Sequence, residues 1–144
     1  MSDGFFVPRA HDGMAAFSGD GGRIILVRNH EMNSGWSRGS PFGEHFATLP
    51  ESTRAKLWDR GNDTTPGLGG TTTSIYDPAS GNVEQQFLSL AGTEINCAGG
   101  ATPWGSWLSC EECFEAPGTR LSSRRLIARN RRHGYVFELP AGAR

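Results

Sequence analysis

Short apolar runs separated by turns rich in glycine and proline are the feature that most limits how this chain can fold. Its 144 residues include 20 glycines and 8 prolines, and only 36% are hydrophobic. Runs this short suit strands, whereas the turn residues interrupt them too often for long helices. The pattern therefore predicts an all-β protein, either a sandwich or a propeller. We find no strict repeat of the kind that marks a WD40-like array.

Local composition predicts two hairpins and two later strands. The expected strands are residues 12–17, 23–28, 71–76, 83–88, 104–111 and 133–139. The turn at 77–82 has the Asp, Pro, Ser, Gly and Asn residues typical of a tight connection, so the second hairpin is the clearer one. Residues 33–47 are expected to form a loop. Residues 50–59 are expected to form one or two helical turns that Gly61 terminates as the C′ residue.

Charge and hydropathy exclude several classes of partner. The formal net charge is −1, which implies no global electrostatic attraction to a partner. No run of eighteen apolar residues exists, so we expect no membrane span. Residues 120–133 contain six arginines but lack the interleaved aromatic side chains that stack on bases. We therefore expect a solvated loop there and no nucleic-acid partner. The N-terminus lacks the charged and apolar regions of a signal peptide, which leaves the localisation open.

A thiol and two adjacent carboxylates make the segment around Cys97, Glu111 and Glu112 the main candidate for chemistry. Thiolates bind soft or borderline metals and carboxylates bind hard cations, so the combination suggests a mixed metal site. In a strand, Glu111 and Glu112 point to opposite faces, so one site can use both only where the strand ends or bulges. The alternative is a buried structural cysteine with two exposed glutamates, which the residue types alone favour.

Two further patterns have structural alternatives of their own. The run from Asn29 through His30 to Glu31 follows a buried strand directly, where sheet proteins often place site residues, although a solvated turn is the commoner explanation. Cys110 and Cys113 have C-x-x-C spacing. A zinc site would need Cys97 and His133 as well, so these two cysteines supply at best half of its four ligands. Three cysteines also cannot all pair within one chain.

Several segments together resemble one family, the PhoX-type calcium-dependent alkaline phosphatases. They occur in the order of that family across nearly the whole chain, and the segment from the cysteine to the paired glutamates is the most specific. The matching segments are residues 10–17, 26–31, 69–73, 96–100, 102–112 and 133–138.

The resemblance implies a β-propeller with a buried iron–calcium cluster that hydrolyses small phosphate monoesters. It implies that Cys97 is the thiolate ligand of iron and that Glu31 is a calcium ligand. Glu111 and Glu112 are implied as carboxylate ligands of the cluster. It also implies weaker candidates that bind or support the metals, namely Asn29, His30 and Asn96. It assigns no catalytic or substrate-binding residue.

The chain departs from the family in length, so residues 1–144 are expected to form a single partial β-propeller domain. The other blades, with their acidic ligands and basic substrate-binding residues, would be missing, and we expect such a fragment to be inactive alone. Members of the family are typically exported to the periplasm or the extracellular space. Two alternatives stay open: a non-catalytic calcium-binding propeller that serves as an interaction scaffold, and a small zinc-binding nucleic-acid module.

Overall fold

A computed structural model describes residues 1–36, 38–43, 46, 49–122 and 124–143. Within these residues strands predominate and helix is scarce, which confirms the predicted all-β class. The strands are β1 (His11–Ser18), β2 (Ile24–His30), β3 (Gly69–Asp77), β4 (Asn82–Thr93), β5 (Asn96–Ala101), β6 (Ser106–Glu111), β7 (Gly118–Ser122), β8 (Arg125–Arg129) and β9 (Val136–Pro140). The helical elements are α1 (Glu51–Arg54) and two 3₁₀ turns, η1 (Asp20–Gly22) and η2 (Gly61–Asp63).

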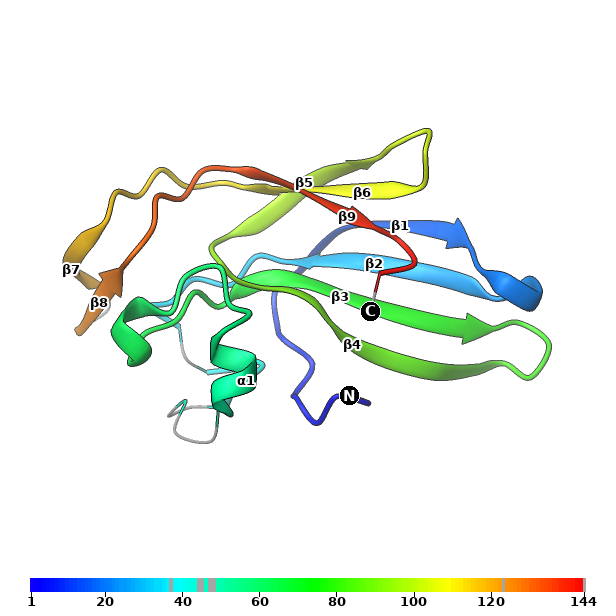
Figure 1. The fold of residues 1–144 in the computed structure, drawn as a ribbon, viewed down its shortest axis with the longest axis horizontal. Coiled ribbons are helices and arrows are strands. Elements are labelled where there is room, and N and C mark those ends of the chain that lie inside the picture. Colours follow the sequence, from blue (N-terminus) through cyan, green and yellow to red (C-terminus); the bar gives the residue numbers. More distant parts are fainter. Residues whose placement is uncertain (37, 44–45, 47–48, 123, 144) are drawn as a thin grey trace.

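The first four strands form one antiparallel sheet in the order β1-β2-β3-β4, which runs along the long axis of the molecule (Figure 1). Both predicted hairpins are therefore confirmed. The turn between β3 and β4 is held locally, because the Asp77 carboxylate accepts hydrogen bonds from the Ala79 amide and the Ser80 hydroxyl. Gly81 takes the positive φ of 73° that this turn needs.

A second sheet has the order β5-β6-β9, and β7 and β8 form a separate hairpin. The predicted strand at 104–111 is confirmed as β6, and the strand at 133–139 begins later, at Val136. β5 was not predicted, because Gly99 and Gly100 remove the side chains that mark a strand. At Gly99 a Cβ atom would lie 2.5 Å from the Trp107 ring, so the glycine lets the two strands approach closely.

The loop predicted at 120–133 and the role predicted for Gly61 were both wrong. The loop expected at 120–133 contains part of β7 and all of β8, because Ile127 is fully buried and Arg129 is held in a buried ion pair. The helical turn expected within 50–59 is confirmed as α1, which ends at Arg54, but Gly61 starts η2 instead of terminating the helix. The chain leaves the helix because the Trp58 and Asp59 amides donate to the backbone carbonyls at the end of β4, at 3.0 Å each.

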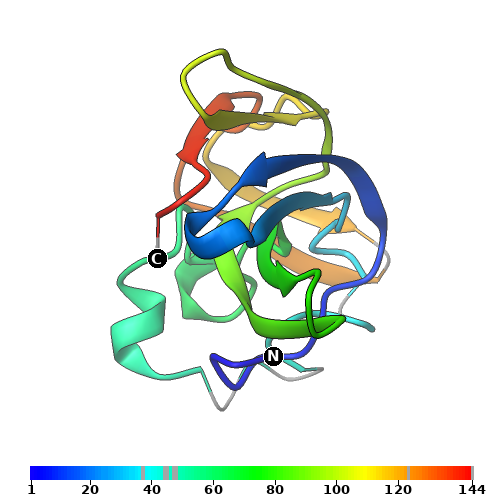
Figure 2. The same ribbon diagram turned by 90° about the vertical axis from the view of Figure 1, so that its right-hand side faces the viewer.

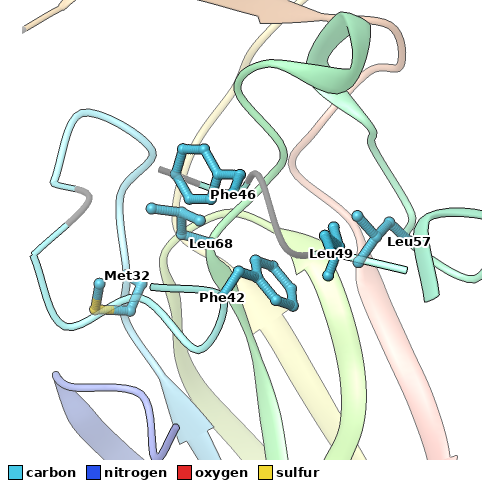
Figure 3. Close-up of a cluster of buried hydrophobic side chains, with 6 residues drawn as sticks. All are labelled: Met32, Phe42, Phe46, Leu49, Leu57 and Leu68. Carbon is cyan, nitrogen blue, oxygen red and sulfur yellow. The ribbon is translucent and has the colours of Figure 1, made fainter. Parts of the chain in front are cut away.

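Residues 37, 44, 45 and 47 of the loop predicted at 33–47 lie outside the described residues. The rest of that segment carries no helix or strand. Its apolar side chains pack with those of neighbouring segments into a cluster that Figure 3 shows, comprising Met32, Phe42, Phe46, Leu49, Leu57 and Leu68. Because Met32 is 1% exposed, this cluster anchors the chain immediately after β2 and after Glu31.

A second apolar cluster joins the two larger sheets, through Val27 of β2, Trp107 of β6, Leu139 of β9 and Ala141. Figure 2 shows the β5-β6-β9 sheet lying across the four-stranded sheet. In the described ranges the sheets close neither a barrel nor a propeller, so the partial propeller remains a prediction. The short helical segments that the structure describes include none with the length and apolar character needed to cross a membrane.

Candidate metal centre

Four side chains with metal-binding chemistry come from four segments that meet near the end of β2. Asp12 lies in β1, Glu31 follows β2, Cys97 lies in β5 and Glu112 follows β6. Three of them were predicted from the sequence. Asp12 was not singled out, although the segment 10–17 that contains it contributed to the family resemblance.

Backbone contacts explain why these segments meet. A Cβ atom added to Gly13 would lie 2.8 Å from the Cys97 carbonyl oxygen, so β1 passes directly over the start of β5. From β2, the Asn29 amide group donates to the carbonyl oxygens of Cys97 and Ala98, at 2.9 Å each. The Glu31 amide in turn donates to the backbone of the segment before β1, at 2.7 Å. The start of β5 is thus tied to both neighbouring strands.

The acidic groups of this centre influence one another. Burial raises the pKa of Glu31, and the carboxylates of Asp12 and Glu112 raise it further. Burial also raises the pKa of the Cys97 thiol, with Glu112 and Asp12 adding to the increase. Both effects disfavour the charged forms in the absence of a cation.

Asn29 and Asn96, predicted to bind or support the metals, are fully buried beneath the centre. The Asn29 carbonyl oxygen accepts hydrogen bonds from the Trp107 indole at 2.9 Å and from the Ser109 hydroxyl at 2.8 Å. The Asn96 amide donates to the same hydroxyl at 3.0 Å. These bonds join β2, β5 and β6 into one polar network that fixes the backbone of Cys97.

His30 is also buried, and its ring nitrogens contact one partner in β3 and one in the segment before β1. Nδ1 lies 3.1 Å from the Arg9 carbonyl oxygen and Nε2 lies 2.8 Å from the Thr72 hydroxyl. Burial lowers the pKa of His30 to about 4, so the ring is neutral near pH 7. In this arrangement His30 supports the sheet near the centre.

Glu111 and Glu112 point in opposite directions, as alternation along a strand requires. Glu112 is exposed, whereas Glu111 is buried. The Glu111 carboxylate accepts four hydrogen bonds, from the backbone amides of Glu94 (2.9 Å), Gly134 (2.7 Å) and Tyr135 (3.1 Å) and from the His133 ring (2.7 Å). A carboxylate has about four lone-pair positions, so a metal would have to displace one of these donors.

His133 lies between two buried carboxylates. Its Nδ1 donates to Glu111 at 2.7 Å, and its Nε2 donates to Asp59 at 3.1 Å. Burial opposes the charged form, but the hydrogen bonds to Asp59 and Glu111 raise the pKa of His133 to about 9. The ring is therefore an imidazolium near neutral pH. Asp59 was not predicted, because a lone aspartate at the end of an expected helix carries no signal for a partner 74 residues away.

Glu111, Cys113 and His133 place one ligand atom each within 4.8 Å of one another. Their chemistry would suit zinc, yet the lone pairs of Glu111 are occupied and both nitrogens of His133 act as donors. Cys110 takes no part in this group, and all three cysteines are free thiols. The group is better described as a hydrogen-bonded network than as an open coordination site.

Comparison with protein-family models matches residues 2–144 to the model described as Alkaline phosphatase PhoX. The chain belongs to the PhoX family. The resemblance inferred from the sequence motifs is thereby confirmed over almost the whole chain. No curated protein and no solved structure gives a significant match.

Membership of the PhoX family indicates phosphatase-like chemistry, and the donor chemistry of the candidate metal centre fits metal-dependent catalysis. Cys97 offers a soft thiolate, and Asp12, Glu31 and Glu112 offer hard carboxylate oxygens. A bound cation would also offset the burial and the repulsion from Asp12 and Glu112 that together raise the pKa of Glu31. The residues present therefore suit the kind of metal cluster that the sequence motifs imply.

Proposed function

We propose that this chain supplies a metal-binding part of a phosphomonoesterase that works with an iron–calcium cluster. The observation that carries the proposal is the gathering of Asp12, Glu31, Cys97 and Glu112 from four separate segments. Placing acidic groups together raises the free energy unless a cation compensates their charge. The assignment to the PhoX family supports phosphate monoesters as the substrates.

Each donor has a role that follows from its chemistry. The Cys97 thiolate would hold iron, and the carboxylates of Glu31 and Glu112 would hold calcium, with Asp12 as a further oxygen donor. When bound, the metals would polarise the phosphoryl oxygens and neutralise the charge that develops on them. Phosphoryl transfer depends mainly on positioning and electrostatics, so it requires no Ser-His-Asp arrangement from this chain.

The surrounding residues keep these donors in place. Asn29 fixes the backbone of Cys97 through its two hydrogen bonds, and Met32 anchors the chain next to Glu31. Glu111 as a direct ligand remains a prediction, because a metal would have to replace one of the four donors to its carboxylate.

We also propose that residues 1–144 form part of a larger propeller whose other blades complete the metal and substrate sites. Two edge strands support this, since β4 and β9 each lack a further strand partner within the described part of the chain. Val83 in β4 and Val136 in β9 are 57% and 60% exposed. Unpaired strand edges with exposed apolar side chains are suited to further strand pairing.

Metal content and hydrolysis of p-nitrophenyl phosphate test the proposal together. We expect iron and calcium in a longer chain that supplies the further blades, with turnover that a chelator abolishes and Ca²⁺ restores. Cys97→Ala should lose iron and activity. Glu84→Gln, an exposed carboxylate in β4 near the opposite end of the sheet, should retain both.

The outcomes separate the candidate functions. Full iron content and activity in Cys97→Ala would contradict the role of this thiol. Calcium binding without hydrolysis would favour the interaction scaffold, and zinc alone would favour the zinc-binding module.

A further inference from the structure

We infer that Asp59 and His133 are positioning residues that hold Glu111 and thereby set the placement of Glu112 and Cys97. We call the three residues Asp59, His133 and Glu111 the clamp. This inference rests on the proposed function, because it concerns how the donors of the same metal centre are held.

The clamp is a chain of two hydrogen bonds closed to solvent. The side chains of all three residues are 0% exposed. His133 bridges the two carboxylates, 2.7 Å from Glu111 and 3.1 Å from Asp59. A buried ring hydrogen-bonded at both nitrogens is held in one geometry, because displacing any member leaves a buried polar group without its partner.

Asp59 connects the clamp to the backbone of other segments. Its carboxylate accepts hydrogen bonds from the backbone amides of Gly61 at 2.8 Å, Asn130 at 2.9 Å and Arg131 at 3.0 Å. These residues lie in η2 and in the segment after β8, outside the two larger sheets. The clamp therefore links η2 and the segment after β8 to the end of β6 through hydrogen bonds.

Glu111 is the point at which the clamp acts on the metal centre. Its carboxylate also binds the amides of Glu94, before β5, and of Gly134 and Tyr135, before β9. One side chain thus joins three segments at the place where β6 ends.

The two donors lie next to this junction. Glu111 is paired with Asn96 in the sheet register, so Cys97 is the next residue on the partner strand. Glu112 is the next residue on the same chain, and its amide donates to the Ile95 carbonyl at 2.9 Å. Releasing the Glu111 carboxylate would therefore loosen the strand end that carries both donors.

Asp59→Asn is the main test, because it replaces a carboxylate that accepts hydrogen bonds from His133 and three backbone amides with an amide of almost the same volume. His133→Ala is a stronger variant, and Asp59→Asn decides the question by itself if His133→Ala does not fold. Ile127→Val is the matched control, since it weakens the buried core of β8 by one methyl group without touching the clamp.

Two readouts are measured on each variant in the longer chain. The first is the hydrogen-exchange rate of the Glu112 amide without metal. We expect it to rise at least tenfold in Asp59→Asn relative to Ile127→Val at equal global stability. The second is the affinity for Ca²⁺ and for iron, each titrated alone, which should fall about tenfold in Asp59→Asn, in the range seen for residues that orient metal ligands.

These readouts separate failure of the inference from failure of the proposed function. If the wild-type protein bound neither metal, the proposed function would fail, and the exchange rate alone would decide whether the clamp positions the strand end. Unchanged exchange at Glu112 in a folded Asp59→Asn protein would overturn the inference. Faster exchange with unchanged metal affinity would overturn the link between the clamp and the metal centre.

Discussion

Replacing Arg129 with methionine should lower the free energy of unfolding by about 3–5 kcal/mol, because it leaves a buried carboxylate without its partner. Arg129 is 3% exposed and Glu94 is fully buried, and the guanidinium Nη2 lies 2.5 Å from the Glu94 carboxylate. Arg129 also donates to the Thr65 carbonyl at 2.9 Å. The loss therefore combines an unpaired charge with an unsatisfied carbonyl group.

Arg132 provides a matched control, because it is an exposed arginine of the same basic stretch. Arg132→Met should change the free energy of unfolding by no more than about 0.5 kcal/mol. The assay is urea denaturation followed by tryptophan fluorescence and by circular dichroism, with both probes required to give the same midpoint.

A double variant separates the charge from the packing. Adding Glu94→Gln to Arg129→Met removes the buried negative charge, so the double variant should be more stable than Arg129→Met alone. A loss of less than about 1 kcal/mol in Arg129→Met, or no recovery in the double variant, would refute the argument that the buried pair controls the stability of this region.

The region around the candidate metal centre gives two further predictions. Burial opposes ionisation of Asp59, but the hydrogen bonds from His133 and from backbone amides lower its pKa to about 2. Its carboxylate therefore contributes about 2 kcal/mol above pH 4, which is lost as the pH falls towards 2. Urea denaturation across this range should show the stability difference between the wild type and Asp59→Asn shrinking, and a constant difference would contradict it. Gly13→Ala should cost about 1–3 kcal/mol and weaken Ca²⁺ binding, because the new Cβ would lie 2.8 Å from the Cys97 carbonyl. Gly100→Ala is the control, since a Cβ there meets no atom within 4 Å, and equal losses in both variants would contradict the close packing of β1 on β5.

The two hairpins of the four-stranded sheet could be predicted because their signals are local. The turn at 77–82 contains its own hydrogen-bonding residues, and the flanking runs have strand composition. β5, β7 and β8 could not be predicted in this way. Gly99 lies in a strand because the Trp107 ring packs against it. Arg129 is buried because it forms an ion pair with Glu94. Those partners lie elsewhere in the chain, so no short window of sequence contains them.

The candidate metal centre shows the same division between local and long-range information. The sequence by itself determined which residues have donor chemistry, since the family motifs single out Glu31, Cys97, Glu111 and Glu112 by their identity and order. Only the tertiary structure decided that Glu111 turns inward while Glu112 faces outward, and that His133 joins Glu111 to Asp59. The physical reason is that the chemistry of a side chain belongs to the residue, whereas its direction and its partners depend on which distant segments pack against it.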